Sequence, residues 1–459
     1  MAWRRRARAR YDGGAGARLP VRDRRLRRRE PRSDRRPQRP RARTRGARGD
    51  RRPPHGELPG DRRRAAGRGR ARADRPAGGA RSNAVAPPAR PVRAGAAGCA
   101  REGADRGKPR RPAHDGGCAG GARRVRAWLA PLGAVFGGAT TLRAALYRRG
   151  VLADTRLGSP VISIGNLAMG GRGKTPLVEL TATLLRDAGC PVAVLSRGHG
   201  GDFRGDLLVV GDGTRVLAEA AQAGDEPVML ARALPGVVVA VGRDRARAGR
   251  GVEAAMGPRV FVLDDGFQHL RLARDLDIVC VDAGDLRERP LPAGVLREPP
   301  SALGRAHLIV VSGEEEDAAR AAGDALSQRF GPARVVRARR CPAGFFDLAG
   351  APARAPARPF LLTGIARPER VVADLAAQGL PLAGQAAFAD HHRFRPDEIE
   401  AVGRQAERSG ADAIVTTAKD AVRLPVAGSA LPVLVWRVRC AVDDEARFRA
   451  RLLGAGGGA

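Results

Sequence analysis

The sequence predicts an α/β fold built on a mostly parallel sheet with helices on both faces, plus a smaller second α/β domain and an N-terminal amphipathic helix. Short apolar runs rich in β-branched residues alternate with helical stretches, which is the pattern of strand–helix–strand units. A glycine-rich turn joins the first of these runs to a helical stretch. The long N-terminal part of the chain lacks any such pattern, so the fold is expected to begin after it.

The expected elements divide the chain into two domains after the N-terminal part. The first domain is expected over residues 156–348. Its strands are expected at 161–164, 192–196, 207–210, 237–241, 260–263, 278–281 and 308–311. A stretch rich in alanine, proline and arginine, 349–359, marks the boundary. The second domain, 349–459, is expected to contain strands at 360–362, 414–416 and 433–438 and a helix at 368–378.

The turn after the first strand is typical of a phosphate-binding loop. Glycines stand at 170, 171 and 173, Lys174 and Thr175 follow, and Pro176 suits the first turn of a helix. In such a loop backbone N–H groups surround phosphate oxygens, the lysine holds the β- and γ-phosphates, and the threonine ligates Mg²⁺. The general pattern places glycine where this chain has Ala168, so a glycine-rich turn with a chance Lys-Thr pair is the alternative. The loop favours a P-loop kinase-like domain.

Adjacent carboxylates stand at two further places. Asp264 and Asp265 end an apolar strand, where a phosphate-loop enzyme places its second magnesium ligand. Two neighbouring carboxylates repel each other, which favours a cation beside them. Asp225 and Glu226 open a helix, whose positive end suits negative charge. The alternatives are an Asp-Gly turn at the strand end and an ordinary helix N-cap.

A carboxylate also precedes two histidines in the string Asp390-His391-His392. Such a group can tune a base or bind a metal. Zinc is weakly indicated, because no third ligand stands at metal spacing. A polar surface loop is the alternative.

The formal net charge of +35 is concentrated at one end of the chain. Residues 1–124 contain 38 arginines, one lysine and 11 acidic residues, a net charge of +28. This composition buries too little apolar surface to offset its ordering entropy, so the segment is expected to be disordered. A basic arm for nucleic acid or anionic lipid is one interpretation, although only Trp3 and Tyr11 are available for base stacking. The favoured interpretation is an upstream stretch translated from a wrongly chosen start in a high-GC coding sequence. A secretory signal peptide is not expected, because no apolar core follows the basic start.

The segment 125–155 has the profile of a helix lying in a membrane interface. An uncharged run over 127–142 is flanked by arginines and has Trp128 and Tyr147 near its ends. It is shorter than the roughly 20 apolar residues that span a bilayer, and flanking arginines suit anionic headgroups. An amphipathic helix packed on the domain is the alternative.

Six cysteines, none in a C-x-x-C pair, indicate neither a zinc site nor a disulfide framework and fit a reducing compartment.

Residues 125–440 resemble the tetraacyldisaccharide 4′-kinases of Gram-negative bacteria, the lipid A 4′-kinases. The matching strings are Pro160-Val-Ile-Ser-Ile-Gly-Asn-Leu167, Gly170-Gly-Arg-Gly-Lys-Thr-Pro176, Leu195-Ser-Arg-Gly198, Gly224-Asp-Glu-Pro227, Asp264-Asp-Gly-Phe-Gln-His269, Arg271-Leu-Ala-Arg-Asp275, Leu296-Arg-Glu-Pro299, Thr363-Gly-Ile-Ala366, Phe388-Ala-Asp-His-His392 and Thr416-Thr-Ala-Lys-Asp-Ala-Val-Arg-Leu424. So many separate strings in the same order argue against a coincidental match.

The resemblance implies ATP-dependent phosphorylation of the 4′-hydroxyl of a tetraacyldisaccharide 1-phosphate, which gives lipid IVA in lipid A biosynthesis. It implies a peripheral enzyme on the cytoplasmic face of the inner membrane, with the acylated disaccharide phosphate and an anionic membrane surface as partners. No specific nucleic acid and no obligate protein partner are expected. ATP and Mg²⁺ are the expected cofactors.

The resemblance also implies roles for individual residues. Asp225 is the expected base, paired with His391, and Lys174 is the third catalytic residue. The nucleotide is expected on Gly170, Gly171, Arg172, Gly173, Lys174, Thr175 and Pro176. Mg²⁺ is expected on Thr175, Asp264, Asp265 and Glu226. Substrate is expected on Gln268, His269, Arg245, Arg297, Glu298 and Asp390.

The chain departs from the family pattern at three places, Arg172, His199 and Ala418, where the family often has threonine, tyrosine and glutamate. None of these removes a proposed catalytic group. Two other classes of function stay open: another P-loop NTPase or small-molecule kinase, and a nucleic-acid-binding protein driven by residues 1–124. A GTPase would need Asn-Lys-x-Asp, whereas the chain offers only Lys419-Asp420 with no residue between.

Overall fold

The computed structural model describes residues 128–457, except 171–172, 314 and 426–428. The predictions for residues 1–124, and those for Gly171 and Arg172 in the loop, lie outside the described residues.

A mostly parallel sheet forms the first lobe and confirms the predicted fold class. Strand β1 (Val161–Asn166) lies at its centre and pairs in parallel with β5 (Val260–Asp264) and β6 (Leu276–Asp282). The order of this half of the sheet is β8-β7-β6-β1-β5-β2-β4-β3, with β3 antiparallel to β4. The other strands are β2 (Val192–Ser196), β3 (Leu208–Gly211), β4 (Val238–Val241), β7 (Leu308–Ser312) and β8 (Val335–Phe346).

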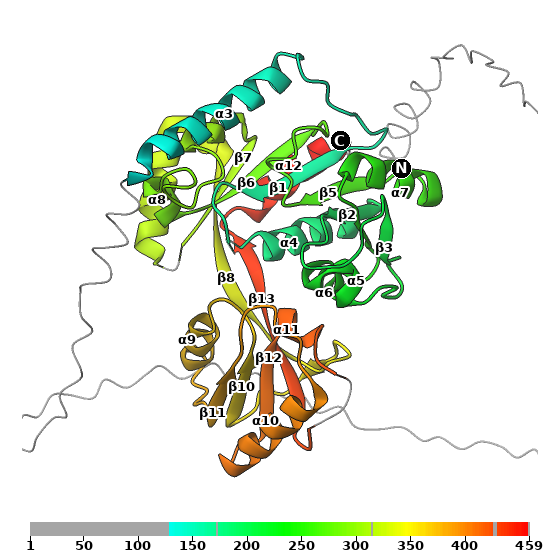
Figure 1. Ribbon diagram of the computed structural model, residues 1–459, viewed down its shortest axis with the longest axis vertical. Coiled ribbons are helices and arrows are strands. Elements are labelled where there is room, and N and C mark those ends of the chain that lie inside the picture. Colours follow the sequence, from blue (N-terminus) through cyan, green and yellow to red (C-terminus); the bar gives the residue numbers. More distant parts are fainter. Residues whose placement is uncertain (1–127, 171–172, 314, 426–428, 458–459) are drawn as a thin grey trace, which may run out of the picture. The chain divides into compact units, whose positions relative to one another are not determined.

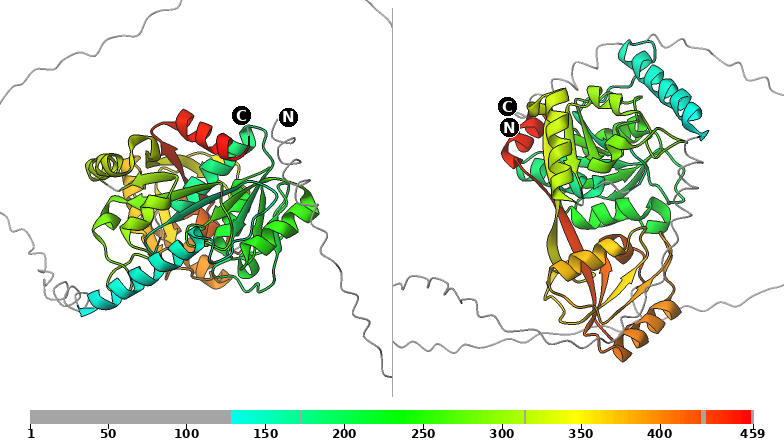
Figure 2. Two further views of the ribbon diagram at one scale, coloured as in Figure 1. Left: turned by 90° about the horizontal axis from the view of Figure 1, so that it is seen from above. Right: turned by 90° about the vertical axis from the view of Figure 1, so that its left-hand side faces the viewer.

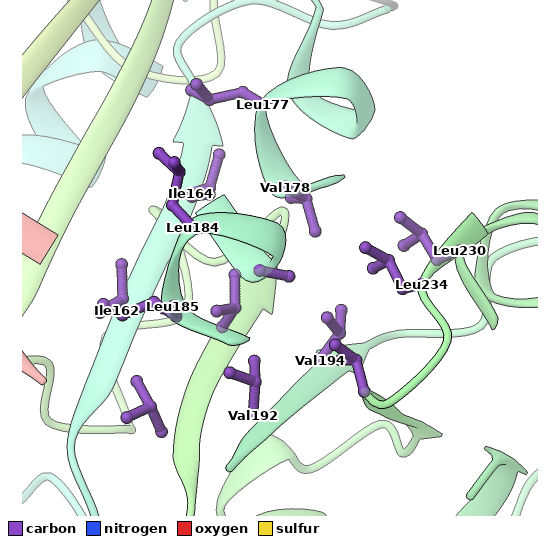
Figure 3. Close-up of a cluster of buried hydrophobic side chains, with 14 of the residues drawn as sticks. Ile162, Ile164, Leu177, Val178, Leu184, Leu185, Val192, Val194, Leu230 and Leu234 are labelled. Carbon is purple, nitrogen blue, oxygen red and sulfur yellow. The ribbon is translucent and has the colours of Figure 1, made fainter. Parts of the chain in front are cut away.

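Helices cover both faces of this sheet because alternate strand side chains are apolar on both sides. On one face, Ile162, Ile164 and Val194 pack with side chains of α4 (Lys174–Asp187) and α6 (Asp225–Ala233), as Figure 3 shows. The buried residues of α4, among them Leu177 and Leu185, recur at helical spacing. The opposite face carries α7 (Arg245–Met256) and α8 (Glu316–Phe330). Shorter helical segments are α5 (Ala220–Ala223), η1 (Ala283–Arg287), η2 (Pro300–Arg305) and η3 (Pro332–Arg334).

The second lobe is a smaller α/β unit. Its strands are β9 (Pro352–Ala353), β10 (Pro359–Thr363), β11 (Gly384–Ala387), β12 (Ala413–Thr417) and β13 (Val433–Val442), in the order β11-β10-β12-β13-β8 with β9 paired to β8. Helix α9 (Glu369–Ala377) contributes Leu375 to one buried cluster, and α10 (Pro396–Arg408) contributes Ile399 to another. A short helix, α11 (Ala418–Ala421), follows β12.

Two long antiparallel strands join the lobes. The start of β8 pairs with β7 in the first lobe, and its remainder pairs with β13 in the second (Figure 1). After β13 the chain returns, and α12 (Glu445–Ala455) buries Phe448 and Leu452 in the main cluster of the first lobe. The domain boundaries at 348 and 349 therefore stay predictions, since the last helix of the chain completes the first core.

Helix α3 (Ala130–Arg148) lies outside the first lobe in both views of Figure 2. It faces the protein with its smallest residues: a Cβ added at Gly133 would lie 3.0 Å from the side chain of Ala293 and 3.0 Å from the carbonyl oxygen of Pro290. Its large apolar side chains point outward, and Trp128 just before it is 88% exposed. Among the described helices, none combines the length and the apolar character needed to cross a bilayer.

Candidate active site

The phosphate-binding loop leaves the carboxyl end of β1 in the setting that the sequence predicts. Asn166, the last residue of β1, donates from its amide to the carbonyl oxygen of Ala168 (2.6 Å) and accepts from Lys174 Nζ (3.0 Å). Gly173 caps α4 with φ +74°, a left-handed conformation that glycine adopts without a Cβ penalty. Lys174, Thr175 and Pro176 form the first turn of α4. The positive end of this helix is thereby directed at the space beside the central strand.

Two cations compensate the charge of Asp265, which follows the neighbouring strand β5. Lys174 Nζ lies 3.0 Å from Oδ1 and Arg297 Nη1 lies 2.7 Å from Oδ2. Burial raises the pKa of Asp265, but the two cations outweigh it and lower the pKa below its usual value. Asp265 has φ +55°, a left-handed conformation that is uncommon outside glycine and is typical of functional sites.

Asp264, one residue earlier, is buried, and the charge of Lys174 and the hydroxyl of Ser196 only partly offset the cost of ionising it. Its Oδ2 accepts from the Ser196 hydroxyl (3.1 Å), while Oδ1 has no hydrogen-bond partner among the described residues. Burial, and then the negative charges of Glu226 and Asp265, raise the pKa of Asp264 well above its usual value. A cation beside Oδ1 would relieve both effects.

The set Asp264, Asp265 and Glu226 therefore fits Mg²⁺, a hard cation that prefers carboxylate oxygens. In the described part of the chain, no three His, Cys, Asp or Glu side chains are arranged to hold a metal ion alone. Magnesium sites of phosphoryl-transfer enzymes commonly use one or two carboxylates together with substrate phosphates and water.

The residues expected to contact substrate follow β5 and β4. Gln268 donates from Nε2 to the Asn166 carbonyl (3.0 Å), and its Oε1 is buried without a partner within the described structure. Burial and the nearby guanidinium of Arg245 lower the pKa of His269 to about 4, so this imidazole is neutral at pH 7. Arg245 itself is buried, with burial and the charge of Arg197 lowering its pKa. Arg245 interacts electrostatically with Asp264 and Asp265, so a buried cation lies near the two strand-end aspartates.

Glu298 is placed differently from the other predicted substrate residues. Both of its oxygens accept from Arg305, at 2.7 and 2.6 Å, and Arg305 lies 3.7 Å from the centroid of the Phe267 ring. Glu298 thereby holds Arg305 against Phe267, which lies two residues after Asp265. Its contact with substrate stays a prediction.

Asp225 and His391 meet across 166 positions of sequence. His391 Nδ1 lies 2.8 Å from Asp225 Oδ2. Gly224, just before Asp225, has φ +90°, and a Cβ there would lie 2.4 Å from the His199 carbonyl oxygen, so the start of α6 requires glycine. His391 has φ +63°, so the second partner is also held in a left-handed conformation. Asp390, beside it, forms an ion pair with Lys419 (3.0 Å).

Motif reasoning missed Lys419 and Arg423, which touch this pair. Lys419 Nζ lies 3.2 Å from His391 Nε2, and Arg423 Nε lies 3.4 Å from Asp225 Oδ2. Both residues belong to the string 416–424, which was one of the matches to the family. That match could have pointed to them, but it came with no role for their side chains.

A phosphate-binding loop at the carboxyl edge of a parallel sheet, with strand-end aspartates and a carboxylate–imidazole pair, defines a P-loop phosphotransferase. The chain belongs to the tetraacyldisaccharide-1-P 4′-kinase family, whose model matches residues 125–456. It is accordingly a kinase.

Similar proteins agree. The chain is 46% identical over 306 residues to the tetraacyldisaccharide 4′-kinase of Anaeromyxobacter dehalogenans (strain 2CP-C), covering 63% of this chain and 79% of that protein. It is 43% identical over 310 residues to that of Geobacter metallireducens, covering 66% and 89%. Its fold is similar to the crystal structure of LpxK from Aquifex aeolicus in complex with ATP, with a TM-score of 0.60, 28% identity and coverage of 72% of this chain and 99% of that one.

Proposed function

We propose that the protein transfers the γ-phosphoryl group of ATP to the 4′-hydroxyl of a tetraacyldisaccharide 1-phosphate, giving lipid IVA. The observation that carries this proposal is the Asp225–His391 pair, because phosphoryl transfer to a hydroxyl needs a base within reach of the acceptor proton. Glu226, the neighbour of Asp225, acts electrostatically on Asp264, so the pair adjoins the phosphate end of the site.

At the phosphate end, residues of the first lobe hold and polarise the nucleotide. The loop from Gly170 to Pro176 surrounds the phosphates with N–H groups, and Lys174 moves from Asp265 to the β- and γ-phosphates. Thr175, Asp264, Asp265 and Glu226 would hold Mg²⁺, which when bound supplies charge neutralisation on the phosphate oxygens.

At the acceptor end, Asp225 takes the proton of the 4′-hydroxyl. His391 donates from Nδ1 to Oδ2 and so orients the carboxylate. The described hydrogen bond and the described ion pairs of Asp225 fall on Oδ2, which leaves Oδ1 to accept the substrate proton. Arg245, Arg297, Gln268, His269, Glu298 and Asp390 are the proposed contacts of the sugar and phosphate groups, since arginine binds phosphate through two parallel hydrogen bonds.

Helix α3 supports a lipid substrate and an anionic membrane surface as partners. Leu132, Val135 and Phe136 are exposed on it, and Arg148 lies in its last turn. Apolar side chains beside basic ones are typical of a helix in a membrane interface, here on the cytoplasmic face of the inner membrane.

The test is transfer of labelled γ-phosphate from ATP to the tetraacyldisaccharide 1-phosphate, with the 4′-O-methyl analogue as the matched acceptor that has no proton to give. We expect a labelled product from the acceptor with the free 4′-hydroxyl and none from the methylated analogue. Excess unlabelled GTP should not reduce the labelling by ATP. Labelling of both acceptors would overturn the assignment of the 4′-hydroxyl. Competition by GTP at equal concentration would instead favour another P-loop enzyme.

A further inference from the structure

We propose that Arg423 and Lys419 are positioning residues for proton transfer, Arg423 by holding the Asp225 carboxylate and Lys419 by fixing the tautomer of His391. This inference rests on the proposed function, in which Asp225 is the base. Both residues come from the string 416–424 at the start of α11 and just after it.

Arg423 is a buried cation with fixed anchors. Its side chain is 4% exposed. Nη1 donates to the His392 carbonyl (2.9 Å) and Nη2 to the Gly364 carbonyl (3.1 Å), and Nη2 also contacts the buried carboxylate of Asp420. These anchors occupy the terminal nitrogens, and Nε lies 3.4 Å from Asp225 Oδ2, an ion-pair contact without hydrogen-bond geometry.

These anchors link three strings that carried the family resemblance, two of which, 363–366 and 416–424, had no assigned role. Gly364 belongs to the loop after β10, His392 to the loop that presents His391, and Asp420 to α11. The Gly364 carbonyl also accepts from the backbone N–H of His391 (3.2 Å). One guanidinium therefore fixes the loop of the histidine and faces the aspartate, so it sets the geometry of the pair from both sides.

Lys419 and Asp225 together fix which nitrogen of His391 carries the proton. An ammonium group can only donate, so His391 Nε2, 3.2 Å from Nζ, accepts with its lone pair. The proton then resides on Nδ1 and is donated to Asp225 Oδ2. Asp390 Oδ2 lies farther from Nε2, at 3.9 Å, and Asp390 is itself paired with Lys419 at 3.0 Å.

Asp225 Oδ2, which can only accept, already favours the proton on Nδ1, and the ammonium of Lys419 adds the second half of the constraint by opposing a proton on Nε2. The ring of His199 lies 6.5 Å from the His391 ring in an edge contact, beyond hydrogen-bond distance. Without Lys419, the nearest described acceptor for a proton on Nε2 is Asp390. We therefore expect loss of the ammonium to allow a proton on Nε2 and to weaken the orientation of the base.

The first measurement is steady-state kinetics of Lys419→Met, which keeps the length of the side chain and removes the donor. We expect kcat to fall about tenfold, by analogy with the loss seen when a partner that orients a metal-ligating histidine is removed. The KM for ATP should be unchanged, and Lys419→Arg should restore part of the activity. Arg393→Met is the control in the loop of His391, because the Arg393 side chain is exposed and its described ion pair is a 4.0 Å contact with Asp202. Arg423→Gln should lower kcat in the same way; if it fails to fold, Lys419→Met alone decides.

The second measurement is the ¹⁵N NMR signature of His391, assigned by comparison with His391→Gln. In the wild type we expect a protonated Nδ1 and an unprotonated Nε2, and in Lys419→Met a protonated Nε2. This readout needs no lipid substrate, so it decides the role of Lys419 even if the wild type fails to phosphorylate the disaccharide. The proposal is overturned if Nε2 stays unprotonated in Lys419→Met, or if kcat stays within twofold of the wild type.

Discussion

The two ends of the site differ in how the chain builds them. The phosphate end comes from the first lobe alone: the loop after β1, the end of the adjacent strand β5 and the first turn of α4. The proton-transfer end joins Asp225 of α6 to His391 of the second lobe, 166 positions later. The phosphate end therefore depends on one sheet, while the other end depends on how the loops of both lobes are anchored.

The electrostatics of the two ends differ in the same way. At the phosphate end, Glu226 and Asp265 act electrostatically on Asp264; two cations compensate Asp265, whereas Asp264 is only partly compensated by Lys174. At the other end, each group contacts one of complementary character. The cation Arg423 contacts the anion Asp225, which accepts from His391 Nδ1, and His391 Nε2 accepts from the cation Lys419. The first arrangement is suited to binding a cation with phosphate, and the second to holding a proton at a defined atom.

The largest effect is expected at the phosphate end. Lys174→Ala removes the ammonium that neutralises the transferred phosphate, and such charge stabilisation contributes on the order of 10²–10³ in rate. Steady-state phosphorylation assays measure the effect. Arg186→Ala is the control, since Arg186 lies in the same helix and pairs with Asp187 near the surface. Activity of Lys174→Ala within threefold of the wild type would show that this loop is not the ATP site.

The proton-transfer end gives the next effect. Asp225→Asn keeps the shape of the side chain and loses its basicity, so we expect turnover to fall by about 10² or more. The turnover of His391→Ala should fall less than that of Asp225→Asn. The double variant should lose less than the product of the two single losses, because the two groups act as a unit. If the loss in the double variant equals the product of the two single losses, Asp225 and His391 act independently of each other.

Helix α3 should affect membrane partition but not the chemistry at either end. Replacing Trp128, Leu132 and Phe136 with serine removes exposed apolar area, so we expect less protein to cosediment with anionic vesicles. The serine variant of Val216 and Leu217, two exposed apolar residues elsewhere on the first lobe, is the control. Equal cosedimentation of both variants with the wild type would contradict an interfacial α3.

The smallest effect concerns stability at Glu179, a half-buried residue of α4. Burial raises its pKa to about 7, partly opposed by Arg437. The pKa of Glu179 is thus higher in the folded protein than its ordinary value of 4.5. The protonated side chain contributes its full stabilisation below pH 4.5, and this contribution is lost as the pH rises through about 7. Glu179→Gln should therefore be more stable than the wild type at pH 8, by about 1–3 kcal/mol, and near it at pH 5.

Urea unfolding at both pH values measures this difference. Glu407→Gln, at an exposed position of α10, is the control and should change neither value. An equal stability of Glu179→Gln and the wild type at pH 8 would show that the carboxylate is accommodated as an ion.

The phosphate end and most strands could be predicted because their signals are local. A strand, a glycine turn and a Lys-Thr pair lie within 158–177, and all the expected strands correspond to strands of the structure. The contacts of Glu298 with Arg305 and of Arg423 with Asp225 could not be predicted, because no spacing specifies which of many arginines meets a given carboxylate. The return of α12 to the first core was also missed, since Phe448 and Leu452 show only that the helix has an apolar side.

The most direct test of a two-ended kinase site measures ATP affinity and single-turnover transfer to the disaccharide on the same samples of wild type, Lys174→Ala and Asp225→Asn. The account predicts that Lys174→Ala loses both, whereas Asp225→Asn keeps its ATP affinity within about threefold and loses transfer by about 10² or more. Equal losses of ATP affinity in the two variants, or transfer by Asp225→Asn at the wild-type rate, would contradict it.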